Sequence, residues 1–215
     1  MKIGVLALQG DFAAHQRTLL AANIDAPEVR TPEALQDLDG LVIPGGESTT
    51  MLRLMNIYGL VEPIKSFVSS GGGVFGTCAG VILMASKVTN PDQFSFGFMD
   101  VDVKRNAYGR QLDSFITNVE APPLGPQPLE AVFIRAPVVE RVGPSVEVLA
   151  SNSGKPILLR QGKHLAATFH PELTKDARVH QYFAKMLEQQ RASSSASSCP
   201  PPAASSNPSP RRGGG

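Results

Sequence analysis

The sequence has few cysteines, no long apolar run and no marked excess of either charge. Its two cysteines, Cys78 and Cys199, lie in very different surroundings, so we expect no disulfide framework and a reduced, cytoplasmic compartment. The chain contains no stretch that approaches the ~20 apolar residues of a membrane span. The apolar run near the start is only six residues long, ends before Asp11, and predicts a buried strand rather than a signal peptide.

The small net charge of +1 is unevenly distributed along the chain. Residues 191–215 hold three arginines and no acid, so the remainder carries 17 basic against 19 acidic side chains. We therefore expect neither a nucleic-acid partner nor a membrane partner. Residues 191–215 consist mainly of Ser, Ala, Pro, Arg and Gly without a hydrophobic period, and predict a disordered tail behind a domain that spans residues 1–190.

Up to residue 86, short apolar runs alternate with segments of helical character. We expect strands at residues 3–8, 26–29, 40–43 and 73–75, with helices that begin near residues 11, 31, 49, 62 and 81. This alternation predicts an α/β fold, namely a doubly wound, mostly parallel sheet with helices on both faces. Ligands of such sheets bind beyond the carboxyl ends of the strands.

Residues 95–170 change to short runs separated by turn residues. They predict antiparallel or mixed strands at residues 99–104, 131–134, 146–149, 157–160 and 165–169. Residues 122–128 hold four prolines and predict a loop. A last amphipathic helix is expected over residues 175–190.

One cysteine stands at a glycine-flanked turn, Gly76-Thr77-Cys78-Ala79-Gly80, between an apolar run and a helical run. Strand, tight turn and helix are the setting of a nucleophile elbow, a sharp turn that exposes a reactive side chain. A Cβ at either glycine would crowd the turn, and a helix N-terminus favours a thiolate. Considered alone, Cys78 is equally consistent with a buried core thiol.

A nucleophilic cysteine needs a base, and the base needs an orienting group. His170 stands in Phe169-His170-Pro171-Glu172, directly after an apolar strand. Residues two apart in an extended segment point to the same side. Cys78, His170 and Glu172 are therefore the candidate nucleophile, base and anionic orienting group.

The chain has three other histidines. His15 shares the apolar face of the first helix with Phe12, Leu19 and Leu20, and we expect it at the helix surface rather than in catalysis. His164 is expected in a turn and His180 in the last helix. Either of these two could be the base only if residues 165–169 do not form a strand.

A second glycine turn, Pro44-Gly45-Gly46-Glu47-Ser48, follows the strand at residues 40–43. Acyl transfer needs donors for the developing oxyanion, and we expect the backbone N–H groups of Gly46 and Ala79 to supply them. The turn could instead cradle a phosphate at a helix N-terminus. It has no lysine, however, and Glu47 would repel an anion.

Three motifs, Pro-Gly-Gly-Glu-Ser, Gly-Thr-Cys-Ala-Gly and Phe-His-Pro-Glu, resemble in order and spacing those of class I (triad) glutamine amidotransferases. Further stretches are similar to the glutaminase subunits of pyridoxal 5′-phosphate synthases: residues 8–10, 105–115, Phe133-Ile134-Arg135-Ala136-Pro137 and residues 169–174. The resemblance covers about residues 1–190. It implies a flavodoxin-like sheet and a reaction without metal or cofactor.

The resemblance also implies a substrate and a partner. The substrate is L-glutamine, contacted by Gly46, Glu47, Ser48, Arg105, Ile134 and Arg135. The partner is a synthase subunit that receives ammonia and makes pyridoxal 5′-phosphate from ribose 5-phosphate and glyceraldehyde 3-phosphate. From the sequence alone, the two arginines could instead pair with Asp102 or Glu130.

Three other functions remain open at this stage. The chain could serve an amidotransferase with another acceptor, such as one of histidine biosynthesis, although residues 105–115 argue against this. It could be a cysteine hydrolase acting on peptides or γ-glutamyl conjugates, which the glycine turn and His-Pro-Glu disfavour. It could also be a non-catalytic docking subunit, which an intact Cys78, His170 and Glu172 disfavour.

Overall fold

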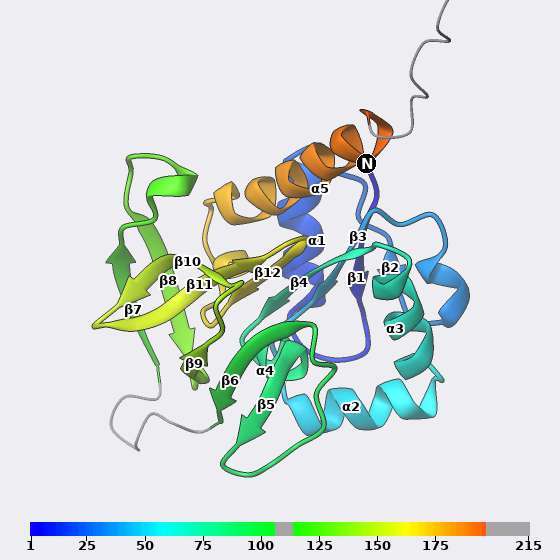
Figure 1. The fold of residues 1–215 in the computed structure, drawn as a ribbon, viewed down its shortest axis with the longest axis horizontal. Coiled ribbons are helices and arrows are strands. Elements are labelled where there is room, and N and C mark those ends of the chain that lie inside the picture. The colour runs from blue at the N-terminus through cyan, green and yellow to red at the C-terminus, as the bar shows by residue number, and fades with distance from the viewer. Residues whose placement is uncertain (106–113, 197–215) are drawn as a thin grey trace, which may run out of the picture.

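The computed structural model describes residues 1–105 and 114–196, and a seven-stranded sheet forms its centre (Figure 1). The strand order is β10-β11-β12-β4-β3-β1-β2. Five of these strands are parallel: β1 (Ile3–Leu6), β2 (Glu28–Val29), β3 (Gly40–Ile43), β4 (Gly73–Thr77) and β12 (His164–Ala167). β11 (Lys155–Gln161) pairs antiparallel with β12, and the edge strand β10 (Glu147–Asn152) pairs antiparallel with β11. The predicted α/β fold with a mostly parallel sheet is confirmed.

Three neighbouring parallel strands at the centre of the sheet end at the same edge. β4 lies between β3 and β12, with Phe75 beside Val42 and Thr77 beside Ala167. All three strands run in the same direction, so the turns that follow them meet at one edge of the sheet. These turns hold the glycine pair, Cys78 and His170.

Helices cover both faces of the sheet. α1 (Phe12–Ala21) and α5 (Arg178–Ala196) belong to one face, where Leu19 and Phe183 pack with Val42 in a single buried cluster. α2 (Ser48–Ile57), α3 (Val61–Ser69) and α4 (Ala79–Met84) cover the other face, where Met51 packs in a second cluster with Leu41. Successive strand residues point to opposite faces, which is why β3 contributes to both clusters.

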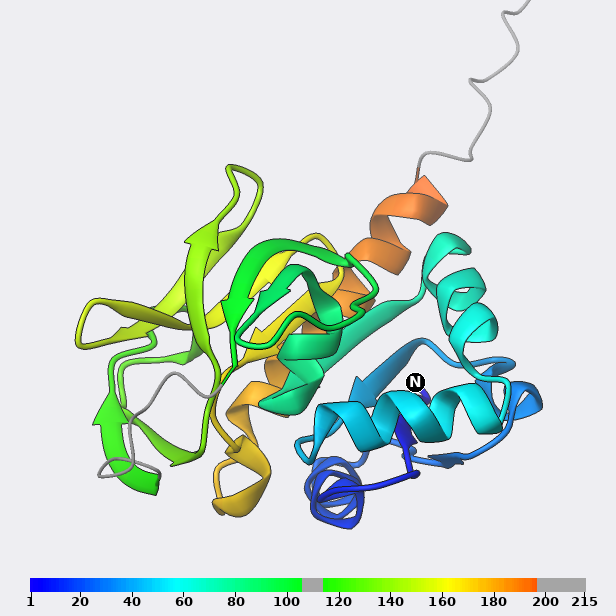
Figure 2. The same ribbon diagram turned by 90° about the horizontal axis from the view of Figure 1, so that it is seen from below.

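The second half of the chain adds two small sheets beside the main one. β5 (Ala85–Thr89) pairs in parallel with β6 (Met99–Lys104), which pairs antiparallel with β9 (Val138–Val142). β7 (Ser114–Val119) and β8 (Leu129–Ile134) form an antiparallel hairpin. Both views place this hairpin at the end of the molecule away from α2 and α3 (Figures 1 and 2).

Several element boundaries differ from the sequence-based expectations. Strands β5, β7 and β9 were not predicted, and the helix expected after Thr31 is only a 3-10 turn, η1 (Pro32–Leu35). Two further 3-10 turns are η2 (Pro122–Leu124) and η3 (Pro171–Leu173). α5 continues to Ala196, past the expected end at residue 190, and the rest of the expected tail lies outside the described residues.

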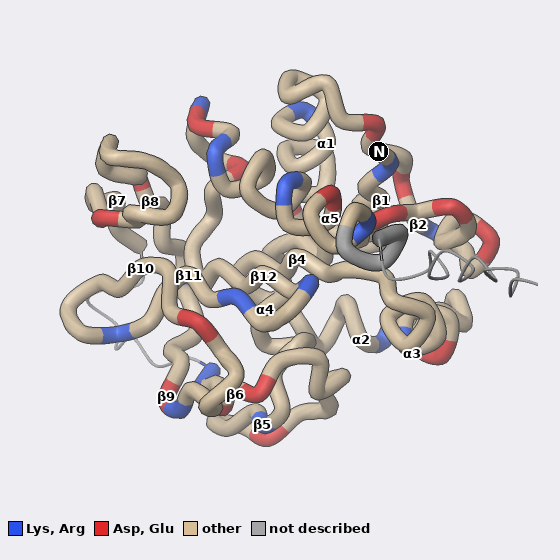
Figure 3. The backbone as a smooth tube through the Cα atoms, turned by 45° about the horizontal axis from the view of Figure 1, so that its top comes forward, with Lys and Arg blue, Asp and Glu red and all other residues tan. Residues whose placement is uncertain are grey.

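Acidic and basic residues are interspersed along the described backbone (Figure 3). Within residues 1–105 and 114–196, none of the helices combines the length and the apolar character that crossing a bilayer requires. Most of the sequence stretch 105–115, on which part of the family resemblance rests, lies outside the described residues.

Candidate active site

Cys78 stands at the sharp turn between β4 and α4. Its φ of +47° is rare for a residue with a side chain, and such strain is often found at functional sites. The flanking glycines make the turn possible. A Cβ on Gly76 would lie 2.5 Å from Sδ of Met84, and one on Gly80 would collide with the carbonyl oxygen of Ile43. The expected strand, tight turn and helix are therefore present, and backbone strain is concentrated on the cysteine.

The thiol of Cys78 is mostly buried, with 7% of the residue exposed. Its backbone N–H donates to the carbonyl of Ala167 at 2.9 Å, which ties the turn to the end of β12. Sγ lies 3.8 Å from the carbonyl oxygen of Ile134. The N–H of Ala79, the first helical residue of α4, has no acceptor within its own helix.

His170 and Glu172 lie at the end of the strand beside the cysteine turn, and both are buried. Nδ1 of His170 is 2.7 Å from Oε1 of Glu172. Burial by itself would lower the pKa of His170, but hydrogen bonding to Cys78 and Glu172 outweighs it and raises that pKa to about 10. The pKa of Glu172 is lowered despite burial, because His15 and His170 stabilise its carboxylate. The three candidate residues thus form one interacting group.

The expectation for His15 is wrong. Its side chain is completely buried, and Nε2 lies 3.0 Å from Oγ1 of Thr77 and 3.4 Å from Oε2 of Glu172. Nδ1 lies 2.8 Å from Nε2 of His180. His15 follows the apolar periodicity of α1 inward with Leu19, whereas Leu20, assigned to the same face, is 57% exposed. That periodicity was the available signal for its burial.

The glycine turn lies directly against His170, the candidate base, and Cys78, the candidate nucleophile. Gly45 is buried, and a Cβ there would collide with Cε1 of His170 and lie 3.4 Å from Cβ of Cys78. The carbonyl of Gly45 accepts a hydrogen bond of 3.3 Å from the N–H of Asp11. The N–H of Glu47 donates to Oε1 of Gln9 at 2.9 Å. Residues 9–11 therefore hold the turn in place.

The carboxylate of Glu47 caps α2 by accepting from the N–H groups of Thr49 and Thr50 at 3.2 and 2.7 Å. These bonds and the hydroxyls of the same threonines outweigh partial burial and lower its pKa to about 2. Nη2 of Arg105 lies 3.3 Å from this carboxylate. Arg105 thus pairs with neither Asp102 nor Glu130.

A cleft of about 280 Å³ joins these groups. Its walls contain Gly46, Glu47, Ser48, Cys78, Ala79, Arg105, Ile134, Arg135 and His170, every candidate residue apart from Glu172, which lies behind His170. Arg135 has a φ of +43°, a second strained residue at the site. Ser48 is buried and its hydroxyl donates to Gln93 at 2.8 Å. Gln9, Asp11, Ile82 and Pro137 also line the cleft and were not predicted.

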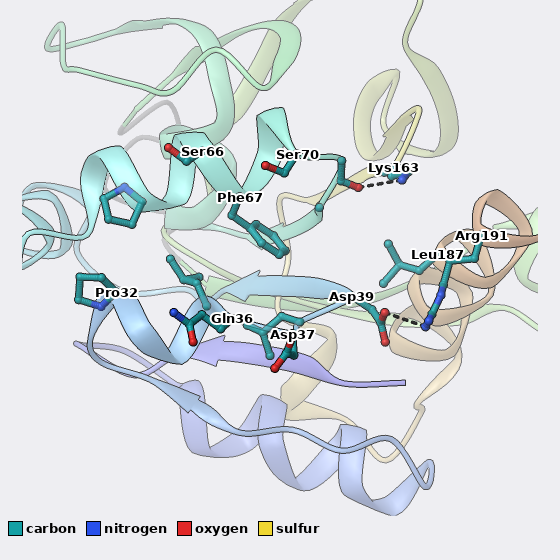
Figure 4. Close-up of a pocket in the computed structure, with 15 residues that line it drawn as sticks. Pro32, Gln36, Asp37, Asp39, Ser66, Phe67, Ser70, Lys163, Leu187 and Arg191 are labelled. Atoms are coloured by element: carbon teal, nitrogen blue, oxygen red, sulfur yellow. Dashed lines mark hydrogen bonds and ion pairs between the residues drawn. The ribbon is translucent and has the colours of Figure 1, made fainter. Parts of the chain in front are cut away.

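A larger cavity, of about 490 Å³, lies at the opposite end of the sheet, near the amino ends of β3, β4 and β12 (Figure 4). Three of its charged groups are engaged within the wall: Lys163 donates to the carbonyl of Gly71 at 2.8 Å, and Arg191 pairs with Asp39 at 2.7 Å. Among the described residues, neither a cysteine nor a histidine lines this cavity. Its walls therefore lack a nucleophile and base of the kind present in the smaller cleft.

Asp11, His170 and Glu172 have potential ligand atoms within 4.8 Å of one another. Nδ1 of His170 and a carboxylate oxygen of Glu172 already hydrogen-bond each other, so a cation would have to replace that bond. The donor set is better suited to orienting an imidazole than to holding a metal ion.

Residues 5–189 match the model of the SNO glutamine amidotransferase family. The chain belongs to this family. One relative is the pyridoxal 5′-phosphate synthase subunit PdxT of Koribacter versatilis. It is 54% identical over 187 residues, which are 87% of this chain and 96% of the relative. The protein of the same name from Desulforamulus reducens is 50% identical over 188 residues, 87% of this chain and 100% of the relative.

Solved structures agree with the family assignment. The crystal structure of a glutamine amidotransferase, 47% identical, superposes on this SNO family member with a TM-score of 0.82, covering 86% of this chain and 98% of the other. A glutamine amidotransferase from Thermotoga maritima, only 12% identical, has a TM-score of 0.54 and covers 89% and 85% of the two chains. The second likeness shows the shared fold alone.

Proposed function

We propose that this chain hydrolyses L-glutamine to L-glutamate and ammonia, and that it supplies the ammonia to a synthase subunit that makes pyridoxal 5′-phosphate. The arrangement of Cys78, His170 and Glu172 beside a cleft, in a member of a glutamine amidotransferase family, carries this proposal. The catalytic domain would span residues 1–190, with residues 191–215 as a tail outside it. The reaction requires a free thiol, which a reducing cytoplasm maintains.

In the first half of the reaction, the thiolate of Cys78 attacks the side-chain carboxamide carbon of glutamine. His170 takes the thiol proton and then gives a proton to the departing ammonia. Glu172 holds Nδ1 of His170, which leaves Nε2 for the thiol and the leaving group. The raised pKa of His170 supports this role, because a histidine that holds its proton beside Cys78 stabilises the thiolate.

The tetrahedral intermediate carries a negative oxygen, for which the N–H groups of Gly46 and Ala79 are the proposed donors. Loss of ammonia leaves a thioester on Cys78. Water then attacks the thioester carbonyl while His170 accepts its proton, and glutamate leaves with restoration of the thiol. These steps need neither a metal nor an organic cofactor.

The charged side chains that line the cleft suit the α-ammonium and α-carboxylate groups of glutamine. Glu47 is anionic and suits the α-ammonium group, while Arg105 and Arg135 suit the α-carboxylate. Ser48 and Ile134 complete the proposed set of contacts. Because the Ser48 hydroxyl is engaged with Gln93, its contact with glutamine would come from the backbone.

The names of the relatives support a synthase partner, since each is called a subunit of pyridoxal 5′-phosphate synthase. Ammonia released into water becomes mostly ammonium, so direct transfer protects its reactivity. The partner would combine it with ribose 5-phosphate and glyceraldehyde 3-phosphate. We further propose that docking of the partner completes the oxyanion turn at Pro44–Ser48.

Release of glutamate from glutamine, measured with and without the synthase subunit, tests the proposal. We expect hydrolysis by the complex and a lower rate for the chain alone. Equal rates would overturn the role of docking in completing the turn. Absence of glutamate release from the complex would overturn the glutaminase function itself.

A further inference from the structure

Behind Glu172, on the side away from His170, three polar side chains meet in the core. His15 comes from α1, Thr77 from β4 and His180 from α5, and all three are completely buried. No step proposed above uses them. Burying three polar groups together is costly unless they are hydrogen-bonded to one another.

We propose that His15 is a positioning residue of the proposed glutaminase, and that its Nε2–H holds the carboxylate of Glu172 in register with the strand that carries Cys78. The inference rests on the proposed function and deepens it. His15 does not touch the reacting atoms and acts through Glu172.

The contacts of Glu172 are divided between two histidines. Oε1 accepts from Nδ1 of His170 at 2.7 Å, whereas Oε2 lies 3.4 Å from Nε2 of His15. The structure shows no hydrogen bond to Oε2 from the described residues, so this longer contact is its stabilising interaction. Without it, half of a buried carboxylate would face the core unpaired.

The same nitrogen also contacts β4. Nε2 of His15 lies 3.0 Å from Oγ1 of Thr77, the residue immediately before Cys78. One imidazole N–H is therefore shared between the orienting carboxylate and the strand end that places the nucleophile. This connection fixes the distance between Glu172 and β4, and with it the position of His170 relative to Cys78.

The hydrogen-bonding pattern determines which nitrogens carry protons. Nδ1 of His180 has no partner among the described residues, so a buried N–H there would be wasted. His180 therefore carries its proton on Nε2 and donates it to Nδ1 of His15, 2.8 Å away. His15 in turn carries its proton on Nε2, which is directed at Glu172 and Thr77.

His180 thus keeps His15 in the tautomer that can donate to Glu172, as second partners do for catalytic imidazoles. Phe75 supports both rings: its centroid lies 5.4 Å from that of His180 and 6.1 Å from that of His15, in edge-to-face geometry. His180 and Phe75 together thus fix the orientation of the Nε2–H group of His15.

Two substitutions separate hydrogen bonding from packing. His15→Phe keeps a planar ring but removes both ring nitrogens. His15→Gln places an amide N–H near the position of Nε2 and restores a donor to Glu172. His164→Phe is the matched control, because His164 also accepts a hydrogen bond inside the fold, from the N–H of Val74 at 3.2 Å, but lies at the opposite end of β12.

The first readout is steady-state hydrolysis of glutamine by the complex. We expect kcat of His15→Phe to fall about 10-fold or more, as loss of a hydrogen bond to a charged group predicts. KM should change less than about twofold, since His15 does not line the cleft. His15→Gln should recover most of kcat, and His164→Phe should retain wild-type kinetics.

The second readout does not depend on glutamine. Alkylation of Cys78 by iodoacetamide, followed by peptide mass spectrometry to separate it from Cys199, gives the pH profile of the Cys78–His170–Glu172 group. Removing a donor from a carboxylate makes the coupled group hold protons more tightly. The profile of His15→Phe should therefore shift to higher pH, and that of His15→Gln should match the wild type.

Asp11 lies within 4.8 Å of Glu172, His180 contacts His15, and Glu130 lies on β8, which packs against η3. The two acids are exposed, and burial lowers the pKa of His180 to about 3, so it stays neutral over the measured range. The shift therefore reports the loss of the His15 donor.

Wild-type kinetics and an unshifted alkylation profile in His15→Phe would overturn the proposal. So would equal losses in His15→Phe and His15→Gln with unshifted profiles, because the role would then be packing. Circular dichroism establishes that each variant is folded. If the wild-type complex does not hydrolyse glutamine, the proposed function fails, while the alkylation profiles still decide whether His15 acts on the Cys78 group.

Discussion

Nδ1 of His170 and Oε1 of Glu172 lie 2.7 Å apart, and only Pro171 separates the two residues in the chain. The turn η3 brings them together after the end of β12, and Cys78 directly follows the neighbouring strand of the sheet, β4. Burial excludes water from this pair, so its electrostatic interaction is stronger than that of an exposed pair.

This pair makes stability depend on pH. The pKa of His170 is raised to about 10 in the fold. Its protonated form therefore contributes fully to the free energy of unfolding below the ordinary histidine pKa near 6.5, and this contribution is lost as the pH rises towards 10. The pKa of Glu172 is lowered, so its contribution is complete above about 4.5 and is lost in stronger acid. Glu172→Gln should therefore reduce the free energy of unfolding most between pH 4.5 and 6.5, by about 2 kcal/mol.

Urea unfolding of both proteins across pH 4–10 measures this difference. It should shrink steadily from pH 6.5 to 10. A difference that stays constant over this range would contradict a contribution of Glu172, beside that of Cys78, to the raised pKa of His170.

Cys78→Ala should lower glutamine hydrolysis by about 10⁴-fold or more, because no other group replaces the covalent nucleophile. The fold and the binding of the synthase subunit should persist, since the substitution removes a single buried sulfur. Glutamate release and co-elution with the partner check these two outcomes. Cys199→Ala is the control and should hydrolyse glutamine at the wild-type rate. A rate for Cys78→Ala within about tenfold of the wild type would exclude the covalent mechanism.

Gly45→Ala should impair catalysis by displacing His170 sterically, without removing any reacting group. Its Cβ would collide with the His170 ring and press on Cys78, so we expect kcat to fall at least about tenfold. Gly59→Ala is the matched control: its φ of +65° disfavours a side chain, but no atom lies within 4 Å. It should lose about 1 kcal/mol of stability and keep wild-type kcat, as glutamate release and thermal unfolding will measure.

Arg105→Met should raise KM for glutamine by about tenfold or more, because a charge-assisted contact to the substrate carboxylate is lost. The effect on kcat should be smaller. Arg141→Met is the control, because Arg141 also forms ion pairs, with Asp100 and Asp102, but does not line the cleft. It should leave KM within about twofold of the wild type. Equal KM values for the two variants would remove Arg105 from the glutamine site.

The parallel half of the fold was predictable because its signals are local. Apolar runs such as Ile3–Leu6 and Gly40–Ile43 are buried on both faces and end in glycine turns, a pattern typical of central parallel strands. β5 was missed because Ala85-Ser86-Lys87-Val88-Thr89 directly continues the apolar run of α4. β7 is missed for a different reason: alternate residues, including Ile116 at 66% exposure, face outward, so its apolar residues do not mark a core.

Cys78, His170 and Glu172 stand in short motifs, so the sequence proposes them as candidate nucleophile, base and orienting group without knowledge of their contacts. His15 could not be assigned in this way. Its neighbours Thr77, Glu172 and His180 are distant in sequence, and only the packing of α1, β4 and α5 brings them together. Gln9 and Asp11 likewise act through backbone contacts with the glycine turn, which a pattern of residue types does not encode.

The strand order β12-β4-β3 also determines when the site becomes functional during synthesis. The ribosome produces the nucleophile turn about 90 residues before the base, and β12 is the last strand to be added to the sheet. A nascent chain that ends before Glu172 holds an unassisted thiol. If Cys78 and His170 act together as proposed, the nascent chain can become reactive only when translation of the domain is nearly complete.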